Sequence, residues 1–184
     1  MDLHDALIRR RTVHRFAPGS VPDEVVDRAL RAATFAPNHK LTWPWRFVFV
    51  GPETREELVA LNTELKASGR TLTDEQRAGI RRKMTSPDRL LSVAQVRVDD
   101  AFRSREDYAT IAMAIQNLSL SLFADGVYAK WSTGGVTRHP ETYRLLGIDP
   151  EEQELVGFVW IGYAEAVPGP ADRPEAAEVT RSVP

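Results

Sequence analysis

Residues 36–50 read Ala-Pro-Asn-His-Lys-Leu-Thr-Trp-Pro-Trp-Arg-Phe-Val-Phe-Val. Pro37 and Pro44 disfavour a helical conformation in the residues before them, so a helix is expected to end at this segment. Residues 46–50 are rich in β-branched and aromatic side chains, which predicts a strand. The segment is therefore a predicted helix-to-strand connector that carries aromatic and basic side chains. Such connectors concentrate binding groups, although tryptophans here are equally compatible with filling the core.

The composition bounds the class of protein. A chain of 184 residues suffices for one domain with a sizeable core. Its formal net charge of −2 lacks the basic bias of a nucleic-acid binder. It has no cysteine, which excludes disulfides and thiolate metal sites and fits a reducing compartment. No apolar run reaches membrane-spanning length, and the N-terminus lacks the apolar run of a signal peptide. We therefore expect a cytoplasmic domain without nucleic-acid or membrane partners.

Hydrophobic periodicity and turn residues place the other elements on both sides of the connector. Helices are expected over residues 3–8, 22–33, 54–66, 73–84, 108–124 and 140–146, and strands over residues 46–50, 90–98, 127–131 and 155–163. Capping boxes are expected at Thr54 and Thr73, and residues 99–106 read as charged and irregular. These elements predict a single domain over residues 1–166.

Two segments suggest contacts beyond one compact domain. Residues 108–124 are apolar around most of the predicted helix, so this helix is expected inside the domain or against a second subunit. Residues 167–184 are rich in proline, alanine and glutamate and cannot build a core of their own. We expect this tail either to trail from the domain or to wrap a neighbouring subunit.

Three polar clusters could carry chemistry: residues 10–14, 38–40 and 130–135. The arginines of the first cluster suit a phosphate group, although an arginine triplet is more often a solvated basic run. The third cluster, Lys-Trp-Ser-Thr-Gly-Gly, could bring backbone amides close to a planar ligand or form a plain turn. The four histidines lack metal-ligand spacing, and the chain has no glycine-rich nucleotide loop or nucleophile elbow.

Together these clusters carry a family resemblance. Residues 10–16, Arg-Arg-Thr-Val-His-Arg-Phe, resemble the Arg-Arg-Ser-x-Arg-x-Phe opening of the nitroreductase superfamily of flavin enzymes. Residues 36–47 are similar to the family's Ala-Pro-Ser…Gln-Pro-Trp-x-Phe segment, and are closest to a compact subgroup with an Asx-His-Lys sequence. Residues 131–134 and 155–162 resemble the family's second flavin turn and its closing strand. The motifs occur in the family's order.

The resemblance implies an α+β fold with a mixed, largely antiparallel central sheet flanked by helices. It also implies a homodimer with one FMN at each end of the subunit interface. The residues that it assigns to FMN binding are Arg10, Arg11, Thr12, His14, Phe35, His39, Trp131, Ser132, Thr133 and Gly134. It assigns no catalytic side chain and no metal ligand.

The resemblance also gives these residues roles. Arg10 and Thr12 would hold the FMN phosphate or ribityl chain, with Arg11 beside them. His14 stands where the family often has Arg or Lys near the flavin pyrimidine, and a histidine supplies positive charge there only when it is protonated. Trp43 replaces a polar residue and would narrow the substrate channel or pack at the dimer contact. Residues 74–84 and 99–106 lie where the family caps the flavin and selects substrates.

The implied function is hydride transfer from NAD(P)H through FMN to a small electron-poor acceptor, such as a nitro, quinone or ene compound. Three alternatives stay open on the sequence. The same fold could fragment flavin or remove halogens. The chain could bind or store flavin without NAD(P)H turnover. It could also be an interaction domain that binds no flavin, in which case the three polar clusters would be coincidental.

Overall fold

The computed structural model describes residues 2–184. Its centre is a five-stranded sheet in the order β1-β5-β3-β2, with β4 also paired to β5. The strands are β1 (Phe16–Ala17), β2 (Trp45–Phe49), β3 (Arg89–Val96), β4 (Tyr128–Ser132) and β5 (Gln153–Ala164). Every strand pairing in the described chain is antiparallel. The α+β class and the largely antiparallel sheet are thereby confirmed.

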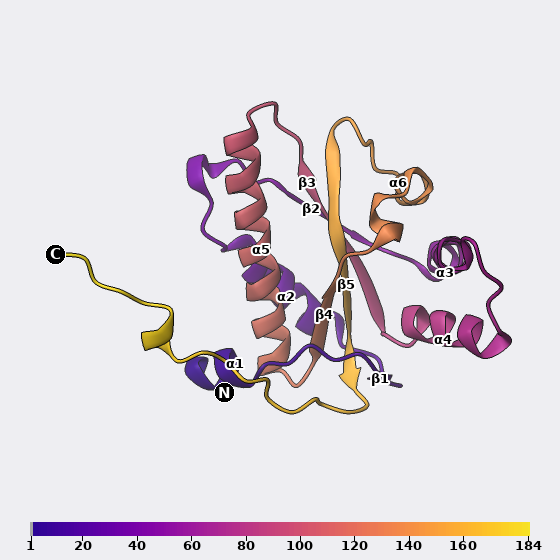
Figure 1. Ribbon diagram of the computed structural model, residues 1–184, viewed down its shortest axis with the longest axis horizontal. Coiled ribbons are helices and arrows are strands. Elements are labelled where there is room, and N and C mark those ends of the chain that lie inside the picture. Colours follow the sequence, from indigo (N-terminus) through magenta and orange to yellow (C-terminus); the bar gives the residue numbers. More distant parts are fainter. Residues whose placement is uncertain (1) are drawn as a thin grey trace.

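Helices cover both faces of this sheet (Figure 1). The long helix α5 (Ala101–Ala124) and α2 (Asp23–Thr34) lie on one face, and α1 (Leu3–Arg9) packs against α5. The other face carries α3 (Pro52–Ala67), α4 (Asp74–Thr85) and α6 (Pro140–Leu146). Short 3₁₀ turns occur at His39–Leu41, Gly135–Arg138 and Ala176–Glu178.

Two hydrophobic cores form because each face of the sheet has its own helical layer. Ala33, Ile111 and Leu118 pack with the sheet in the core beneath α2 and α5. Leu58 and Phe158 belong to the core beneath α3 and α4. All residues from 155 to 162 of β5 are buried, since helices cover this strand on both sides. The almost unbroken apolar sequence there follows from this central position.

The expectation that residues 99–106 are irregular was wrong. The carboxylate of Asp100 accepts hydrogen bonds from the backbone N–H groups of Phe102 (2.8 Å) and Arg103 (3.0 Å), and α5 begins at Ala101. An aspartate at this position satisfies the free N–H groups of the first turn. Arg103, Arg105 and Glu106, which helped to suggest a loop, belong instead to the first turns of α5.

The two predicted capping boxes had different outcomes. At Thr73 the box is confirmed: Gln76 N donates to Thr73 Oγ1 (3.2 Å), and Thr73 N donates to Gln76 Oε1 (2.9 Å). At Thr54 it was wrong, because α3 already begins at Pro52 with Gly51 as its N-cap. Proline has a helical φ and no N–H to satisfy, so it starts this helix two residues earlier than expected.

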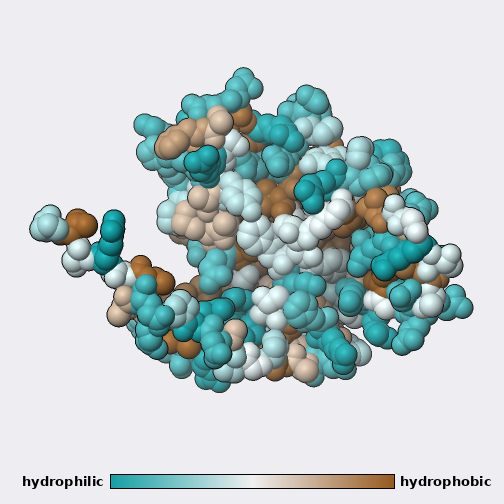
Figure 2. Space-filling model, in the orientation of Figure 1, coloured by the Kyte–Doolittle hydropathy of each residue, from teal (hydrophilic) through white to brown (hydrophobic). Residues whose placement is uncertain are grey.

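The tail leaves the sheet after Ala164, and every residue from 165 to 184 is exposed. In Figure 1 it runs past α1 and projects from the body of the molecule. Apolar side chains that include Val167, Val179 and Val183 are exposed on it, and Figure 2 shows brown atoms along the projection. Among residues 2–184, no helix combines the length and the hydropathy that crossing a bilayer requires.

Candidate functional site

The N-terminal arginines form a crowded cationic group. Arg10 caps the end of α1 and is half-buried, and its Nε atom is buried without a hydrogen-bond partner. Burial is the main cause that lowers the pKa of Arg10, followed by the positive charges of Arg11 and Arg173. No carboxylate forms a salt bridge with any of these three arginines in the part of the chain that the structure describes. The group therefore has the positive charge that an anionic ligand would need.

Arg173 is a candidate that the sequence reasoning missed. It lies in the tail, far from Arg10 in the sequence, and the fold brings the two charges close together. The tail was identified by its composition alone, and composition gives no indication of where a single arginine points. No signal in the sequence distinguishes Arg173 from Arg181 or from the other charged residues of the tail.

A second cationic group lines a cavity of about 450 Å³ beside β1. The residues that line it are His14, Arg15, Phe16, Arg82, Lys83, Ser86 and Glu165. The cavity closes where β1 continues its pairing with the end of β5, since Glu165 N donates to Arg15 O (3.1 Å). Four basic side chains face one carboxylate here, although the whole chain carries a net charge of −2. An anion in this cavity would be stabilised by that excess.

Helix α4 contributes two basic side chains to this cavity. The sequence placed residues 74–84 only where substrates are selected, but Arg82 and Lys83 line the same cavity as His14. Lys130 of β4 lies nearby and is half-buried. Burial is the main cause that lowers the pKa of Lys130, and the ammonium groups of Lys83 and Lys66 lower it further. Like charges gathered in this way cost folding free energy, which suggests that they serve a ligand.

The third predicted cluster lies where β4 ends. The indole of Trp131 is 6.4 Å from the ring of Tyr108, and its Nε1 atom is buried without a partner. It also lies close to Gly157, where a Cβ atom would stand 2.6 Å from Trp131 Nε1 and 2.8 Å from Ser132 O. A side chain cannot be accommodated at Gly157 without moving β4. Thr133 and Gly134 line a separate cavity of about 360 Å³ with Tyr108.

The connector residues lie elsewhere in the protomer. Phe35 is 73% exposed and lines a cavity of about 490 Å³ with Leu41, Trp43 and Trp45. Trp43 is half-exposed, and its ring centroid lies 5.8 Å from that of Trp45. His39 is exposed in the same connector. The cavities that contain His14, Phe35 and Thr133 share no lining residue, so the predicted site residues form separate groups within one protomer.

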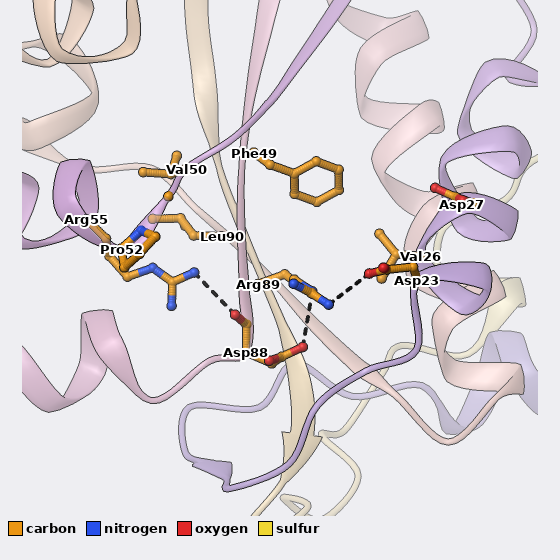
Figure 3. Close-up of a pocket in the computed structure, with 11 residues that line it drawn as sticks. Asp23, Val26, Asp27, Phe49, Val50, Pro52, Arg55, Asp88, Arg89 and Leu90 are labelled. Atoms are coloured by element: carbon orange, nitrogen blue, oxygen red, sulfur yellow. Dashed lines mark hydrogen bonds and ion pairs between the residues drawn. The ribbon is translucent and has the colours of Figure 1, made fainter.

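Another charged cavity, of about 300 Å³, contains none of the predicted site residues (Figure 3). Several of its charged side chains are held by other groups of the protein. Arg89 forms salt bridges with Asp23 (2.9 Å) and Asp88 (3.2 Å), and the Asp88 carboxylate also accepts a hydrogen bond from Val21 N (2.9 Å). Arg55 donates to the backbone oxygens of Pro87 (2.8 Å) and Asp88 (3.3 Å). These contacts join the starts of α2, α3 and β3, which indicates a structural junction.

No group of three or more His, Asp or Glu residues within residues 2–184 is arranged to hold a metal ion. The polar groups that stand out are instead guanidinium, ammonium and imidazole groups without carboxylate partners. Such a donor set suits phosphate and other anionic ligands.

Comparison with known proteins places the sequence in a family. The profile of the Nitroreductase family matches residues 7–163. YfhC of Bacillus subtilis (strain 168) is 30% identical to this chain over 171 residues. The match covers 90% of this chain and 86% of YfhC, which is provisionally named an NAD(P)H nitroreductase.

Solved structures show the same fold. The nitroreductase-like family protein from Bacillus cereus is 26% identical with a TM-score of 0.82, covering 100% of this chain and 96% of that protein. The NADPH:FMN oxidoreductase from Vibrio harveyi, solved with NAD+, has a TM-score of 0.78 at 18% identity. The match covers 97% of this chain and 76% of that protein. Because the family profile spans most of the described sheet and its helices, this chain belongs to the nitroreductase family.

Proposed function

We propose that this oxidoreductase of the nitroreductase family uses FMN to pass a hydride from NAD(P)H to a small electron-poor acceptor. The observation that carries the proposal is the Arg10 group. A half-buried arginine with a free Nε lies beside two more arginines, and the described chain supplies no carboxylate to any of them. A phosphate group is the anion that such a set of forked donors recognises best.

The groups described above fit the parts of FMN. Arg10, Arg11 and Thr12, together with Arg173, would hold the phosphate and the adjoining ribityl chain. His14 and Lys83 would lie near the flavin pyrimidine, because both line the basic cavity beside β1. The residues at the end of β4 would lie along the flavin: Trp131, Ser132, Thr133 and Gly134. The Nε1 atom of Trp131 itself is buried against Gly157 without a hydrogen-bond partner.

A homodimer would complete the site. Phe35 and His39 lie on the connector, apart from the cavity of His14, and in this proposal they reach the FMN bound mainly by the partner subunit. Large apolar side chains are exposed on α1 and α5, as a subunit contact would require: Leu3, Leu7, Ile8, Phe102, Tyr108 and Met113. The tail over residues 167–184 would wrap the partner, since it projects from its own body with apolar residues exposed.

When bound, FMN supplies the redox chemistry, accepting a hydride from NAD(P)H and delivering it to a nitro, quinone or ene acceptor. The side chains bind and orient. Lys83 supplies positive charge at the pyrimidine end, where negative charge would develop. Arg15 and Arg82 line the same cavity and would add permanent positive charge, whereas His14 would add charge there only when protonated. The rings of Trp131 and Tyr108, whose centroids lie 6.4 Å apart, would border one side of the flavin.

An anaerobic titration tests the proposal directly. The visible spectrum of the purified protein, reconstituted with FMN, is followed while NADH or NADPH is added. We expect flavin bands that bleach with at least one donor and return when a nitro or quinone compound is added. Flavin bands that persist with both donors would favour flavin storage without turnover. Absence of bound flavin after reconstitution would refute the proposed site.

A further inference from the structure

The connector between α2 and β2 has an unusual backbone. Three of its residues that are not glycine have positive φ angles: Lys40 (61°), Leu41 (52°) and Trp43 (49°). In this left-handed region the Cβ atom of an L-residue crowds the backbone, so each such residue costs conformational energy. Residues of this kind persist where the surrounding structure holds them, and they concentrate at functional sites. The contacts that hold these three are therefore informative.

Asn38 and Thr42 hold the connector from within. Asn38 Oδ1 accepts a hydrogen bond from the backbone N–H of Trp43 (2.8 Å), the last of the left-handed residues. Asn38 Nδ2 donates to Thr42 Oγ1 (2.9 Å). The side chain of Asn38 therefore holds both Thr42 and Trp43. These bonds alone would move with the loop and would not fix it relative to the rest of the protein.

Helix α5 supplies the fixed side of the contact. Thr42 Oγ1 donates to Asp107 Oδ1 (2.5 Å), and Thr110 Oγ1 donates to the carbonyl oxygen of Pro37 (3.1 Å). Asp107 and Thr110 are each only 2% exposed and lie one turn apart on α5. A buried carboxylate is costly unless it accepts hydrogen bonds, so the Thr42 contact strongly favours this arrangement.

The strained residues form one wall of a cavity. Leu41 and Trp43 line the cavity of about 490 Å³ that also contains Phe35 and Trp45. With ordinary φ angles the backbone would carry these two side chains in other directions. The strained backbone therefore determines where the side chains of Leu41 and Trp43 lie.

We propose that Asp107 and Thr110 are positioning residues, which act through Thr42 and Asn38 to keep the connector in its strained form. This inference rests on the proposed function, in which the connector borders the flavin and the acceptor. The network would set the space that an aromatic, electron-poor acceptor meets, with Leu41 and Trp43 as the parts that it places. Neither Asp107 nor Thr110 would touch flavin or acceptor.

The variant Thr42→Val tests this, because valine keeps the shape of threonine and removes the hydroxyl. We expect amide hydrogen exchange over residues 37–45 of the FMN-loaded protein to speed up by about tenfold or more, as the loss of a buried hydrogen bond to a carboxylate predicts. We also expect KM for an aromatic nitro acceptor to rise by several fold, with a smaller change in kcat. The variant Thr42→Ser retains the hydroxyl. Its exchange rate over residues 37–45 and its KM should therefore stay close to those of the wild type.

Ser119→Ala is the control, on the helix α5 that also carries Asp107 and Thr110. The Ser119 hydroxyl is buried and donates to Ile115 O (2.7 Å) within α5, so its loss removes a hydrogen bond without touching the connector. Equal exchange over residues 37–45 in Thr42→Val and Ser119→Ala would overturn the bracing role. Faster exchange with unchanged KM would overturn the positioning role. The exchange experiment needs no turnover, so its failure is distinguishable from failure of the proposed function.

Discussion

Replacing Arg10 with alanine should weaken FMN binding by roughly 10- to 150-fold. A hydrogen bond from a guanidinium to an anion contributes about 1.5–3 kcal/mol, and each 1.4 kcal/mol is about tenfold in Kd. Two features of the structure favour the lower part of this range. Arg10 is only half-buried, and Arg11 and Arg173 would continue to attract the phosphate after its removal. The assay is fluorescence titration of FMN with flavin-free protein.

The same substitution should leave the flavin-free protein at least as stable as before. The lowered pKa of Arg10 means that burial and its two arginine neighbours disfavour its charge in the folded state. Removing that charge relieves the crowding, so the thermal midpoint without FMN should not fall. Weaker binding would then reflect a lost ligand contact, because the fold is intact.

Arg28→Ala is the matched control for this experiment. Arg28 is an exposed arginine whose charge is already paired with Asp125 (2.9 Å), and it lies on α2. We expect its FMN affinity to equal that of the wild type. The FMN affinity of Arg10→Lys should lie between those of Arg10→Ala and Arg28→Ala, because lysine retains the charge and loses the forked geometry. Equal affinities for Arg10→Ala and Arg28→Ala would refute the assignment of Arg10 to the phosphate.

Three further changes test other parts of the structure. Lys130→Met should raise the thermal midpoint at pH 7, because it removes a half-buried cation whose pKa is lowered by burial. The penalty in the wild type is fully present below that lowered pKa and disappears as the pH rises towards the unfolded value of 10.5, so the variant's advantage should shrink over that window; an advantage that grows with pH would contradict this. Gly157→Ala should destabilise the protein by about 1–3 kcal/mol in urea unfolding, because its Cβ would meet Trp131 at 2.6 Å; Gly169→Ala, with open space around it, should be close to neutral. Deleting residues 167–184 should shift sedimentation from dimer to monomer, and an unchanged dimer would show that the tail does not hold the partner.

Local sequence signals predicted most of the secondary structure. Gly147 ends α6 with a left-handed φ of 64°, and Gly126 does the same after α5 with 75°, as their positions after apolar runs indicated. The errors occurred where two local signals competed. Asp100 was taken as part of a charged loop, although it caps α5, and Thr54 was taken as a cap although Pro52 starts α3.

The grouping of the candidate site could be predicted only in part. The arginines near α1 and the turn after β4 could be proposed as candidates because their chemistry is local in the sequence. Arg173 and Lys83 were missed, because their proximity to Arg10 and to His14 depends on how the tail and α4 pack. The family resemblance supplied the roles of residues, and it gave no information on these two.

The sequence by itself determined the class of fold, the order of its elements and the family, because periodicity, proline and glycine positions and short motifs act over a few residues. The buried network around Asp107 depended on tertiary structure. Asn38 and Thr42 are polar residues in a turn, and Asp107 and Thr110 are polar residues one turn apart in an apolar helix. Nothing in the sequence indicates that the two pairs are in contact. Only the packing of α5 beneath the connector brings Thr42 Oγ1 within 2.5 Å of Asp107 Oδ1. Contacts between distant segments are set by the fold as a whole, since each segment's own residues are compatible with many partners.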